Sequence, residues 1–535
     1  YDALGRRTGR TTPTGAVSSW TYDAAGRRTS LTTSGRTISF EHDAAGQEIA
    51  RHIGDTVSFT NEYDPLGRLT SQHVTAADRS IQRRDYSYRA DGNLIALTDQ
   101  LTGTRTFDLD PAGRVTAVHA AGWTERYAYD EAGNQTEASW PASHPGQEAV
   151  GTREYTGTTI TRAGSIRYEH DALGRITLRQ KTRLSRKPDT WRYEWDAEDR
   201  MRSVTTPDGT VWRYKYDALG RRTAKKRLTN DGLTVLERVT LTWDGTTLSE
   251  QAVASGPSSS VVVLTWDHDG LRPLVQAERI LASYVTQDLI DERFFSIVTD
   301  LVGRPTELID EACVLSWQTR STLWGTTTWT SSSTTYTPLR FPGQYFDPET
   351  GFHYNHFRHY DPETGRYLTV DPLGLPPSPT PTNYVQNPLT GADPLGLAPC
   401  SVANEGIENR GEGNFWTNDL SHVTGSTARA RNRAIEIMMR EDFPDLNFSY
   451  VPEYSPWVNT GIAKIGEGTQ IGYKPFESRL ELRRTLIHEE LHHRWWDRGI
   501  TDHHPRDRSG TYHQFYGTVD RYLRMRGWTS GAEGD

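Results

Sequence analysis

"YDAAGRRT" occupies Tyr22 to Thr29, and close copies of it run through the first half of the chain. The pattern also begins at Tyr1, His42 and Tyr63, so the unit returns about every 20 residues. Later copies begin at residues 109, 129, 170 and 216. Units this short can bury their apolar faces only by stacking on their neighbours, and the pattern therefore predicts a repeat architecture.

Each unit predicts a β-hairpin. An aromatic residue ends one strand, and the side chain of the Asp that follows can accept hydrogen bonds from main-chain N–H groups two residues further on. A Gly then stands where a positive φ is expected, and a polar, β-branched strand such as "RRTSLT" follows. The chain should therefore open with a long series of antiparallel strands.

Composition agrees with a mainly β protein and excludes several classes. Hydrophobic residues make up 35% of the 535 residues, with 25 Tyr and 16 Trp, which suits aromatic-bearing strands. A net charge of −9 argues against a nucleic-acid or anionic-membrane binder. The two cysteines, Cys313 and Cys400, provide neither a disulfide framework nor a cysteine metal cluster. No apolar run is long enough to span a bilayer, and no stretch resembles a signal peptide.

The units resemble the YD repeats of Rhs proteins, of the TcC component of insecticidal toxin complexes, and of teneurins. "LRFPGQYFDPETGFHYNHFRHYDPETGRYLTVDPLGL" (Leu339–Leu375) and "NYVQNPLTGADPLGL" (Asn383–Leu397) are similar to the end of an Rhs core. The resemblance covers roughly residues 1–397. It implies a hollow β-cocoon shell over residues 1–338 and a core-closing segment over residues 339–397. Because the chain opens inside a repeat unit, we also expect an upstream part of the shell.

In that family the core cuts itself from a C-terminal toxin just after the closing DPxGL, which implies cleavage between Leu397 and Ala398. The resemblance carries an aspartyl-protease role onto Asp371 and Asp393, each of which opens a "DPLGL". Two carboxylates held close together cannot both ionise easily, so one can hold a proton while the other activates water.

Three points about this pair stay open in the sequence. Asp361 is a further candidate for the dyad, and Arg366 could tune it. Asp-Pro dipeptides also initiate turns without any catalytic role. Finally, "PPSPTPT" (Pro376–Thr382) stands where many relatives carry Gly-Gly, and this stiffer stretch puts the approach of Asp393 to Asp371 in doubt.

Residues 398–535 predict a separate, small α+β domain. The sequence indicates an amphipathic helix over residues 427–442, whose Met stripe we interpret as core, and short strands at 446–452, 460–465 and 469–474. A helix from about residue 477 to 498 and a last helix over 511–527 follow. A small sheet followed by two helices is the frame of a zincin-type metalloprotease.

"HEELH" in the first of these closing helices satisfies the HExxH pattern. His488 and His492 are four residues apart on one helical face, where both imidazoles can reach one Zn²⁺ ion. Glu489 lies beside that face and can take a proton from water that the zinc activates. The alternative is a solvated helix with incidental histidines.

Zinc needs a third protein ligand, and the longer HExxHxxGxxH pattern fails because Arg498 stands at the third His position. His493 points about 100° away from His492 around the helix. The stretch "HEELHH…GTYHQFY" is similar to SprT-like metalloproteases, in which the third His begins the next helix, and this resemblance favours His513. His503 and His504, in the preceding loop, are alternatives.

Two other classes of cargo remain. "TDHHPRD" could begin an HNH-type, metal-dependent nuclease, although its remaining Asn and His are missing at usable spacing and the region is not basic. A non-enzymatic binding cargo would need no metal.

The expected whole is an Rhs-type toxin whose shell encloses a zinc metallopeptidase and releases it by autoproteolysis. The resemblance implies secretion or delivery into a target cell by a delivery system, a protein substrate there and a cognate immunity protein. The net charge argues against a nucleic-acid partner, and no apolar run suggests membrane insertion. Interbacterial competition or attack on a host cell is the implied setting.

Overall fold

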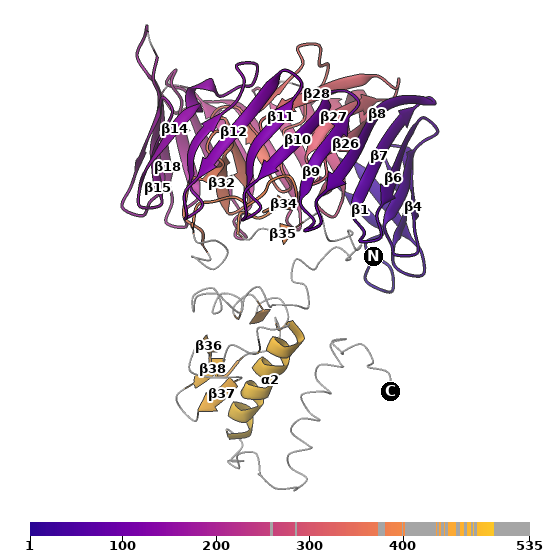
Figure 1. Ribbon diagram of the computed structural model, residues 1–535. Helices are drawn as coiled ribbons and strands as arrows, with labels where there is room; N and C mark the ends of the chain where they lie inside the picture. Colours follow the sequence, from indigo (N-terminus) through magenta and orange to yellow (C-terminus); the bar gives the residue numbers. More distant parts are fainter. Residues whose placement is uncertain are drawn as a thin grey trace. The chain divides into compact units, whose positions relative to one another are not determined.

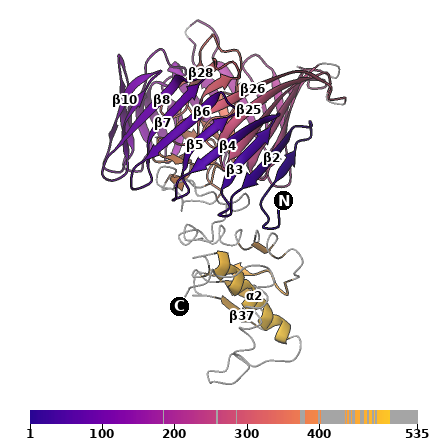
Figure 2. The ribbon, with the colours of Figure 1, turned by 90° about the vertical axis from the view of Figure 1, so that its right-hand side faces the viewer.

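The computed structural model describes residues 1–183, 185–229, 231–256, 260–283, 286–372, 380–397, 400–401, 435, 438–439, 443, 448–455, 461–464, 468–471, 475 and 479–496. The chain divides into two compact units, one that contains the strands before residue 402 and one that contains the later helix and strands. Figures 1 and 2 show the first unit as a tall, curved wall of strands.

That wall is one antiparallel sheet of 29 strands among the described residues, in which each strand pairs with the next along the chain. The strands are β1 (Gly9–Thr11), β2 (Val17–Tyr22), β3 (Arg28–Thr33), β4 (Arg36–His42), β5 (Glu48–Ile53), β6 (Val57–Tyr63), β7 (Leu69–Ala76), β8 (Arg79–Tyr88), β9 (Leu94–Asp99), β10 (Gly103–Leu109), β11 (Val115–Ala120), β12 (Trp123–Tyr129), β13 (Gln135–Ser139), β14 (Gly151–Thr156), β15 (Thr159–Ala163), β16 (Ile166–His170), β17 (Ile176–Lys181), β18 (Asp189–Trp195), β19 (Met201–Thr205), β20 (Val211–Tyr216), β21 (Arg222–Leu228), β22 (Val235–Asp244), β23 (Thr247–Ala254), β24 (Val261–Asp269), β25 (Arg272–Leu281), β26 (Leu289–Thr299), β27 (Pro305–Asp310), β28 (Leu315–Ser321) and β29 (Thr327–Trp329). The predicted mainly β fold is confirmed, with a short 3-10 helix (Gln147–Ala149) between β13 and β14.

The repeat turn has the predicted chemistry, as the copy at Asp64 illustrates. Its carboxylate accepts hydrogen bonds from the main-chain N–H groups of Leu66 (2.9 Å) and Arg68 (3.0 Å). The Arg68 Nε donates to the other carboxylate oxygen at 2.7 Å. Gly67 has a φ of 79°, which explains why Gly occupies this position.

The repeated aromatic and Arg residues join one unit to the next. The Tyr63 hydroxyl donates to the carbonyl of Glu48 in the preceding unit (2.9 Å), and Arg27 donates to the carbonyl of Asp43 in the following one (3.0 Å). Arg68 lies over the ring of Tyr88, 4.9 Å from its centroid. Units that begin with Tyr are thus tied backwards through the hydroxyl and forwards through the Arg, whereas the copies that begin with His or Leu lack the hydroxyl.

The core-closing segment packs on the inner side of this sheet. It forms a four-stranded antiparallel sheet of β30 (Tyr345–Asp347), β31 (Phe352–Asn355), β32 (Arg358–Asp361) and β33 (Arg366–Tyr367). Aromatic side chains of the segment, including Phe341, Phe352, Tyr360 and Tyr367, share one hydrophobic cluster with strands β8–β20. A buried ion-pair network adds a polar tie, because Asp347 pairs with Arg222 (2.6 Å) and Lys225 (3.0 Å) of β21.

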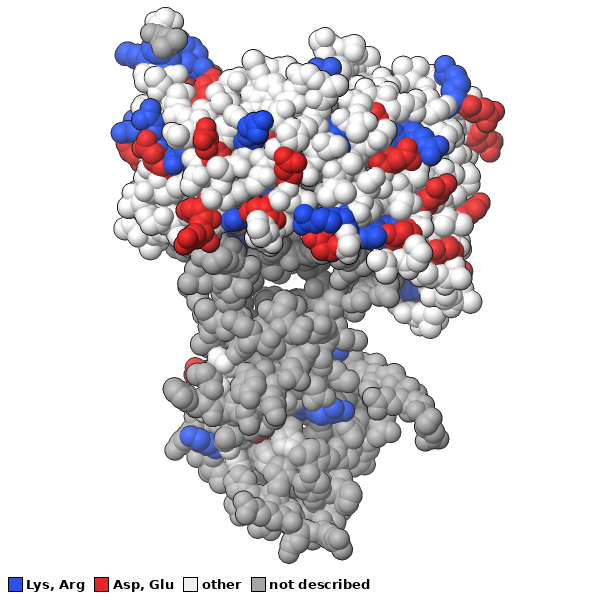
Figure 3. Space-filling view, in the orientation of Figure 1, with Lys and Arg blue, Asp and Glu red and all other residues white. Residues whose placement is uncertain are grey.

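The inward faces of the first strands meet the inward faces of later ones. Trp20, Leu31 and Phe59 from β2–β6 share a hydrophobic cluster with Phe294 and Ile309 from β26 and β27. In this region two distant stretches of the sheet therefore pack directly on each other. Against β8–β20, the packing partner is instead the closing segment. On the outer face in Figure 3, basic and acidic side chains alternate, and this face has no patch of a single sign.

The second unit contains a three-stranded sheet and one long helix among its described residues. In the sheet, β38 (Gly468–Ile471) lies between β36 (Glu453–Tyr454), which runs parallel to it, and the antiparallel β37 (Gly461–Lys464). Helix α2 (Arg479–Trp496) packs on β37 and β38. The predicted helix at 477–498 and the strands at 460–465 and 469–474 are confirmed within a few residues.

Two other predictions for this unit fare differently. The strand predicted at 446–452 is wrong in position, since its described residues are not in a strand and β36 begins at Glu453. Ile435 and Met438, in the helix predicted over 427–442, are helical and buried, which agrees with a core role for the Met stripe. The predicted last helix at 511–527 lies outside the described residues.

Cys313 is a buried free thiol in the first unit. No described helix has the length and apolar character that a membrane crossing requires.

Candidate functional site

The two histidines of the HExxH motif lie one turn apart on α2. Their ring centroids are 5.1 Å apart, with the rings inclined at 75°. His492 is buried and also stacks on Trp496, at a centroid distance of 5.5 Å. The i, i+4 spacing thus brings two imidazoles together on one helical face, as a shared metal ion requires.

Glu489 sits next to these imidazoles and is itself buried, with 5% of its surface exposed. Burial raises the pKa of Glu489 to about 7, although a hydrogen bond from the main chain of Ala463 opposes this shift. Ala463 belongs to β37, so the edge of the small sheet contacts the carboxyl group directly. A buried carboxyl of this kind can exchange a proton near neutral pH, which general acid–base catalysis requires.

The neighbouring Glu490 and His493 hold the helix in place. Glu490 accepts hydrogen bonds from Ser449 and forms an ion pair with Arg494, one turn further along the helix (2.8 Å). The His493 Nε2 is 2.8 Å from the Thr469 hydroxyl of β38. His493 therefore faces the sheet, as its helical position predicts, and not the His488–His492 pair.

The third metal ligand cannot be placed from the described residues. His513, His503 and His504 all lie outside them, and the assignment of His513 stays a prediction. Within the described part of the chain no group of three or more His, Cys, Asp or Glu side chains could hold a metal ion. The pair His488–His492 fits two positions of a three-histidine zinc site by its donor chemistry and spacing.

In the first unit the structure brings Asp371 and Asp393 to the same side chain. Arg358 Nη2 lies 2.8 Å from an Asp371 carboxylate oxygen and 3.2 Å from Oδ2 of Asp393. Both carboxylates are buried, and so is Arg358. The two Asp-Pro motifs therefore converge on one guanidinium.

The chain that follows Asp393 forms a tight turn over this cluster. The Leu397 main-chain N–H donates to Asp393 Oδ1 at 2.8 Å, and Arg358 Nε donates to the Gly396 carbonyl at 2.6 Å. The main-chain N–H of Phe357 also donates to the Leu395 carbonyl (3.1 Å). The residue on the N-terminal side of the predicted cleavage bond is thus held beside the carboxylates, while Ala398 lies outside the described residues.

The other two predicted members of this site lie elsewhere. Asp361 is buried under the Tyr168 hydroxyl, at 2.9 Å, and burial together with Glu363 raises its pKa. Arg366 instead donates to Asn134 and Asn383 (2.9 and 3.0 Å). Arg358, and not Arg366, is the arginine that contacts the two carboxylates.

Sequence reasoning missed three residues of this cluster, Asn355, Arg358 and Tyr367. All three lie in the closing motif "HYNHFRHYDPETGRYLTVDP", but the sequence does not show which of its polar side chains turn towards Asp393. The Tyr367 hydroxyl at the end of β33 donates to Asp393 Oδ2 at 2.8 Å, although the two residues are 26 positions apart.

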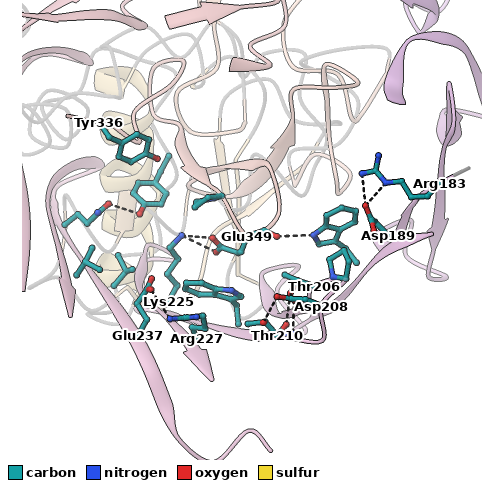
Figure 4. A pocket seen from close by; sticks show the side chains of 18 of the residues that line it. Arg183, Asp189, Thr206, Asp208, Thr210, Lys225, Arg227, Glu237, Tyr336 and Glu349 are labelled. Carbon is teal, nitrogen blue, oxygen red and sulfur yellow. Dashed lines mark hydrogen bonds and ion pairs between the residues drawn. The ribbon is translucent and has the colours of Figure 1, made fainter. Parts of the chain in front are cut away.

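A cavity of about 910 Å³ lies against the sheet beside β30, and Figure 4 shows side chains that line it. Strands β18 and β20–β23 line one side of it, and Tyr336, Tyr345 and Glu349 line the other. Its charged groups pair with one another, as Lys225 does with Glu349 (2.9 Å) and Arg183 with Asp189 (2.7 Å). None of the predicted site residues lines this cavity.

Comparison with protein families finds three matches along the chain. The family described as metallopeptidase toxin 5 matches residues 419–528, and the teneurin YD-shell family matches residues 285–378. The RHS repeat family matches residues 1–36, 88–122, 110–139 and 195–232.

Several curated proteins are similar to the chain. Double-stranded DNA deaminase toxin A of Burkholderia cenocepacia is 33% identical over 384 residues, which is 67% of this chain and 26% of that protein. The toxin protein Tse5 of Pseudomonas aeruginosa is 30% identical over 454 residues, or 74% of this chain and 34% of that protein. Probable deoxyribonuclease RhsB of Dickeya dadantii is 28% identical over 76% of this chain and 28% of its own length. The chain therefore spans about a quarter to a third of these relatives.

Solved structures share the fold. The Tc holotoxin pore of Photorhabdus luminescens superposes with a TM-score of 0.62 at 20% identity, covering 75% of this chain and 21% of that one. The crystal structure of TcdB2-TccC3 gives a TM-score of 0.60 at 19% identity, over 74% of this chain and 22% of that one. At this level of identity the likeness concerns the curved β-shell alone.

Proposed function

The chain is an Rhs-type toxin with a YD-repeat shell and a metallopeptidase toxin domain, and from this premise we propose that it releases a zinc-dependent peptidase by cutting itself after Leu397. The single observation that carries the peptidase assignment is the placement of His488 and His492 one turn apart on α2, beside the buried Glu489, within the residues matched by the metallopeptidase toxin family. That match also spans "TDHHPRD", which favours a peptidase over the nuclease alternative.

In this proposal His488 and His492 hold the metal, with His513 as the third ligand. A bound zinc ion supplies Lewis acidity for the scissile carbonyl and lowers the pKa of water. Glu489 accepts the proton of the attacking water and passes it to the amine that leaves. The pKa of about 7 that burial gives Glu489 suits both transfers near neutral pH.

Expression of residues 398–535 in a sensitive cell tests the peptidase. Glu489→Gln should keep the metal and abolish toxicity, because it removes only the proton acceptor. His488→Ala or His492→Ala should lose metal and toxicity together, and His513→Ala should weaken metal binding more than His503→Ala or His504→Ala. If Glu489→Gln stays as toxic as the parent, the peptidase assignment is refuted. If His513→Ala stays toxic and still holds one full equivalent of metal, His513 is not the third ligand. Mass spectrometry of cleaved cellular proteins would identify the protein substrate.

We assign the self-cleavage to Asp371 and Asp393. Their convergence on Arg358 and the hydrogen bond of Leu397 N–H to Asp393 support this assignment. In the reaction, the oxygen of one water molecule bonds to the carbonyl carbon of Leu397, and one carboxylate takes the water's proton. The other carboxyl group protonates the nitrogen of Ala398 as the carbon–nitrogen bond breaks, which leaves a C-terminal carboxyl and a free amine.

Denaturing electrophoresis of the purified chain tests this assignment. The parent should run as two pieces, and the N-terminus of the smaller piece should be Ala398. Asp371→Asn and Asp393→Asn should each leave one intact chain. Efficient cutting in both variants would refute the dyad and point to Asp361 or to an external protease.

The remaining elements of the proposal concern the longer protein. The shell would enclose the peptidase until delivery into a target cell, and a cognate immunity protein would protect the producing cell. These partners follow from the Rhs-type architecture, whose relatives include the toxin protein Tse5.

A further inference from the structure

The carboxylate of Asp393 is surrounded by hydrogen-bond donors. The Tyr367 hydroxyl lies 2.8 Å from Oδ2, and Arg358 Nη2 lies 3.2 Å from the same oxygen. The Leu397 main-chain N–H donates to Oδ1 at 2.8 Å. Both oxygens of Asp393 therefore act as acceptors, which is the hydrogen-bonding pattern of an ionised carboxylate.

Asn355 determines the direction of the Tyr367 hydrogen bond. The Asn355 Nδ2 is 2.7 Å from the main-chain carbonyl oxygen of Asp393 and 2.8 Å from the Tyr367 hydroxyl oxygen. A carbonyl oxygen only accepts, so the amide must present its NH₂ group to this side. The Tyr367 oxygen then accepts the second N–H of Asn355, and its own single proton is left for Asp393.

Burial keeps this arrangement in one state. Asn355, Tyr367 and Asp393 are each no more than 2% exposed. Burial, and then the charge of Asp393, raise the pKa of Tyr367 well above its usual value, so the hydroxyl stays a donor across the physiological range. A hydroxyl that is fixed as a donor favours the charged form of the carboxylate it faces.

We propose that Asn355 and Tyr367 are positioning residues for self-cleavage, which hold Asp393 as the ionised member of the dyad and thereby make it the base. This inference rests on the self-cleavage proposed above and adds the roles of the two carboxyl groups. Asp393 takes the proton of the attacking water, and Asp371 donates its proton to the nitrogen of Ala398. At the end of the step Asp393 is protonated and Asp371 is ionised, and exchange with solvent restores the pair.

The second hydrogen bond of Asn355 positions the peptide itself. By holding the Asp393 carbonyl, Asn355 fixes the start of the turn whose last residue, Leu397, carries the carbonyl to be attacked. Arg358 holds the same turn at the Gly396 carbonyl. Base and substrate are thus aligned by one small set of buried donors.

The test compares Tyr367→Phe with Tyr360→Phe in the full chain. Tyr360 is a matched control, because its buried hydroxyl donates to the Trp324 carbonyl (2.7 Å) and not to the dyad. Each variant is made by a short pulse of cell-free synthesis, synthesis is stopped, and the loss of intact chain is followed in buffers from pH 5 to 9. Circular dichroism and thermal unfolding of purified samples report on the fold.

Tyr367→Phe should slow cleavage about 10-fold or more at pH 7, since a hydrogen bond to a charged group is lost. It should also move the acid limb of the cleavage–pH profile to higher pH, because the base is then neutralised more easily. Asn355→Ala should shift the limb in the same direction. Tyr360→Phe should stay within about twofold of the parent, with an unchanged profile, because its lost bond does not reach the dyad.

The outcomes separate this inference from the self-cleavage itself. If Asp371→Asn and Asp393→Asn block cutting but Tyr367→Phe keeps the parent rate and profile, the role of Tyr367 is refuted and the dyad stands. The role of Tyr367 is also refuted if Tyr367→Phe cuts more slowly but has the same cleavage–pH profile as Tyr360→Phe, because the effect is then only structural. If Tyr367→Phe does not fold, Asn355→Ala decides by the same profile. If Asp371→Asn and Asp393→Asn both still cut, the assignment of the dyad itself is refuted.

Discussion

His492 and His493 are neighbours in the chain but have different surroundings. His492 faces His488, one turn away along α2, at a ring-centroid distance of 5.1 Å. His493 bonds Thr469 of β38 and lies 4.7 Å from the Tyr450 ring. The helical turn of about 100° per residue thus separates a metal-binding candidate from a packing residue.

A pair of substitutions tests this division of roles. His493→Ala should lower the free energy of unfolding by about 1–3 kcal/mol, because it leaves the buried Thr469 hydroxyl without its partner. Its metal content should match that of the parent. His492→Ala should instead lose metal while the metal-free protein keeps most of its stability. Elemental analysis and chemical unfolding of both variants give the comparison, and loss of metal in a well-folded His493→Ala would contradict it.

Two buried arginines of the closing segment allow a similar comparison. Arg358 contacts both dyad carboxylates, whereas Arg366 contacts Asn134 and Asn383. Arg358→Lys should slow self-cleavage strongly, because a single ammonium cannot reproduce the contacts of a guanidinium with two carboxylates and the Gly396 carbonyl. Arg366→Lys should lower stability but not slow self-cleavage, so that no intact chain is seen on a gel. A fully cleaved Arg358→Lys would show that this guanidinium is dispensable.

At the scale of elements, the hairpin of β31 and β32 carries three buried histidines. Burial lowers the pKa of His356 to about 4 and that of His359 to about 3, and it lowers the pKa of His353 well below its usual value. Positive neighbours add to this for each ring. The charged groups that face the three rings are Arg340, Arg304 and Asp347 at His353, Arg221 and Asp217 at His356, and Arg222 and Asp347 at His359.

This hairpin should make the shell sensitive to acid. The unfolded chain binds a proton at each of these histidines near pH 6.5, whereas the folded chain does so only near pH 4 or below. The free energy of unfolding is therefore unaffected by these histidines above about pH 6.5. Below that pH it falls by about 1.4 kcal/mol per pH unit for each histidine, until the pH reaches about 4. Urea unfolding at pH 7.5 and 5 measures the loss.

A matched control separates this effect from general acid sensitivity. His359→Phe should reduce the dependence on pH, since it removes one buried titrating ring. His73→Gln should leave the dependence unchanged, because the His73 ring is not one of these buried rings and lies half-buried beside Ser80. Equal pH dependence in the parent and in His359→Phe would contradict the explanation.

At the scale of the whole molecule, the repeats form a continuous wall that two long-range packing contacts hold together. The closing segment packs on β8–β20, and β2–β6 pack on β26 and β27. Both contacts join residues that are far apart in the sequence, as the ring contact of Tyr193 with Phe352 illustrates. Self-cleavage after Leu397 would therefore cut the chain without releasing the closing segment, since that segment remains bound by its own aromatic core and by the Asp347 ion pairs.

This predicts what a protease would do to the full protein. If the shell encloses the peptidase, added trypsin should spare residues 398–535 in the intact particle, although the segment contains many Lys and Arg residues. The same segment expressed alone should be cut faster. Electrophoresis and mass spectrometry over time measure both rates. Rapid digestion of the C-terminal segment while the shell survives would show that it lies outside.

The sequence by itself determined the local structure of the shell and the position of the helix that carries the HExxH motif. An aromatic–Asp pair followed by Gly and Arg encodes a hairpin through contacts within a few residues, as at Asp64 and Arg68. The HExxH spacing likewise needs only the geometry of one helix, and α2 brings His488 and His492 together as expected. Interactions of such short range can be read from spacing alone.

Only the tertiary structure decided what surrounds Asp393. The hydrogen bonds of Asn355, Arg358 and Tyr367 depend on the register of β31–β33 and on the path of a turn some 30 residues later in the chain, which no local pattern specifies. The same holds for the packing of β2 to β6 on β26 and β27. Such contacts depend on how distant strands meet, because burial rewards the whole arrangement and not any single segment.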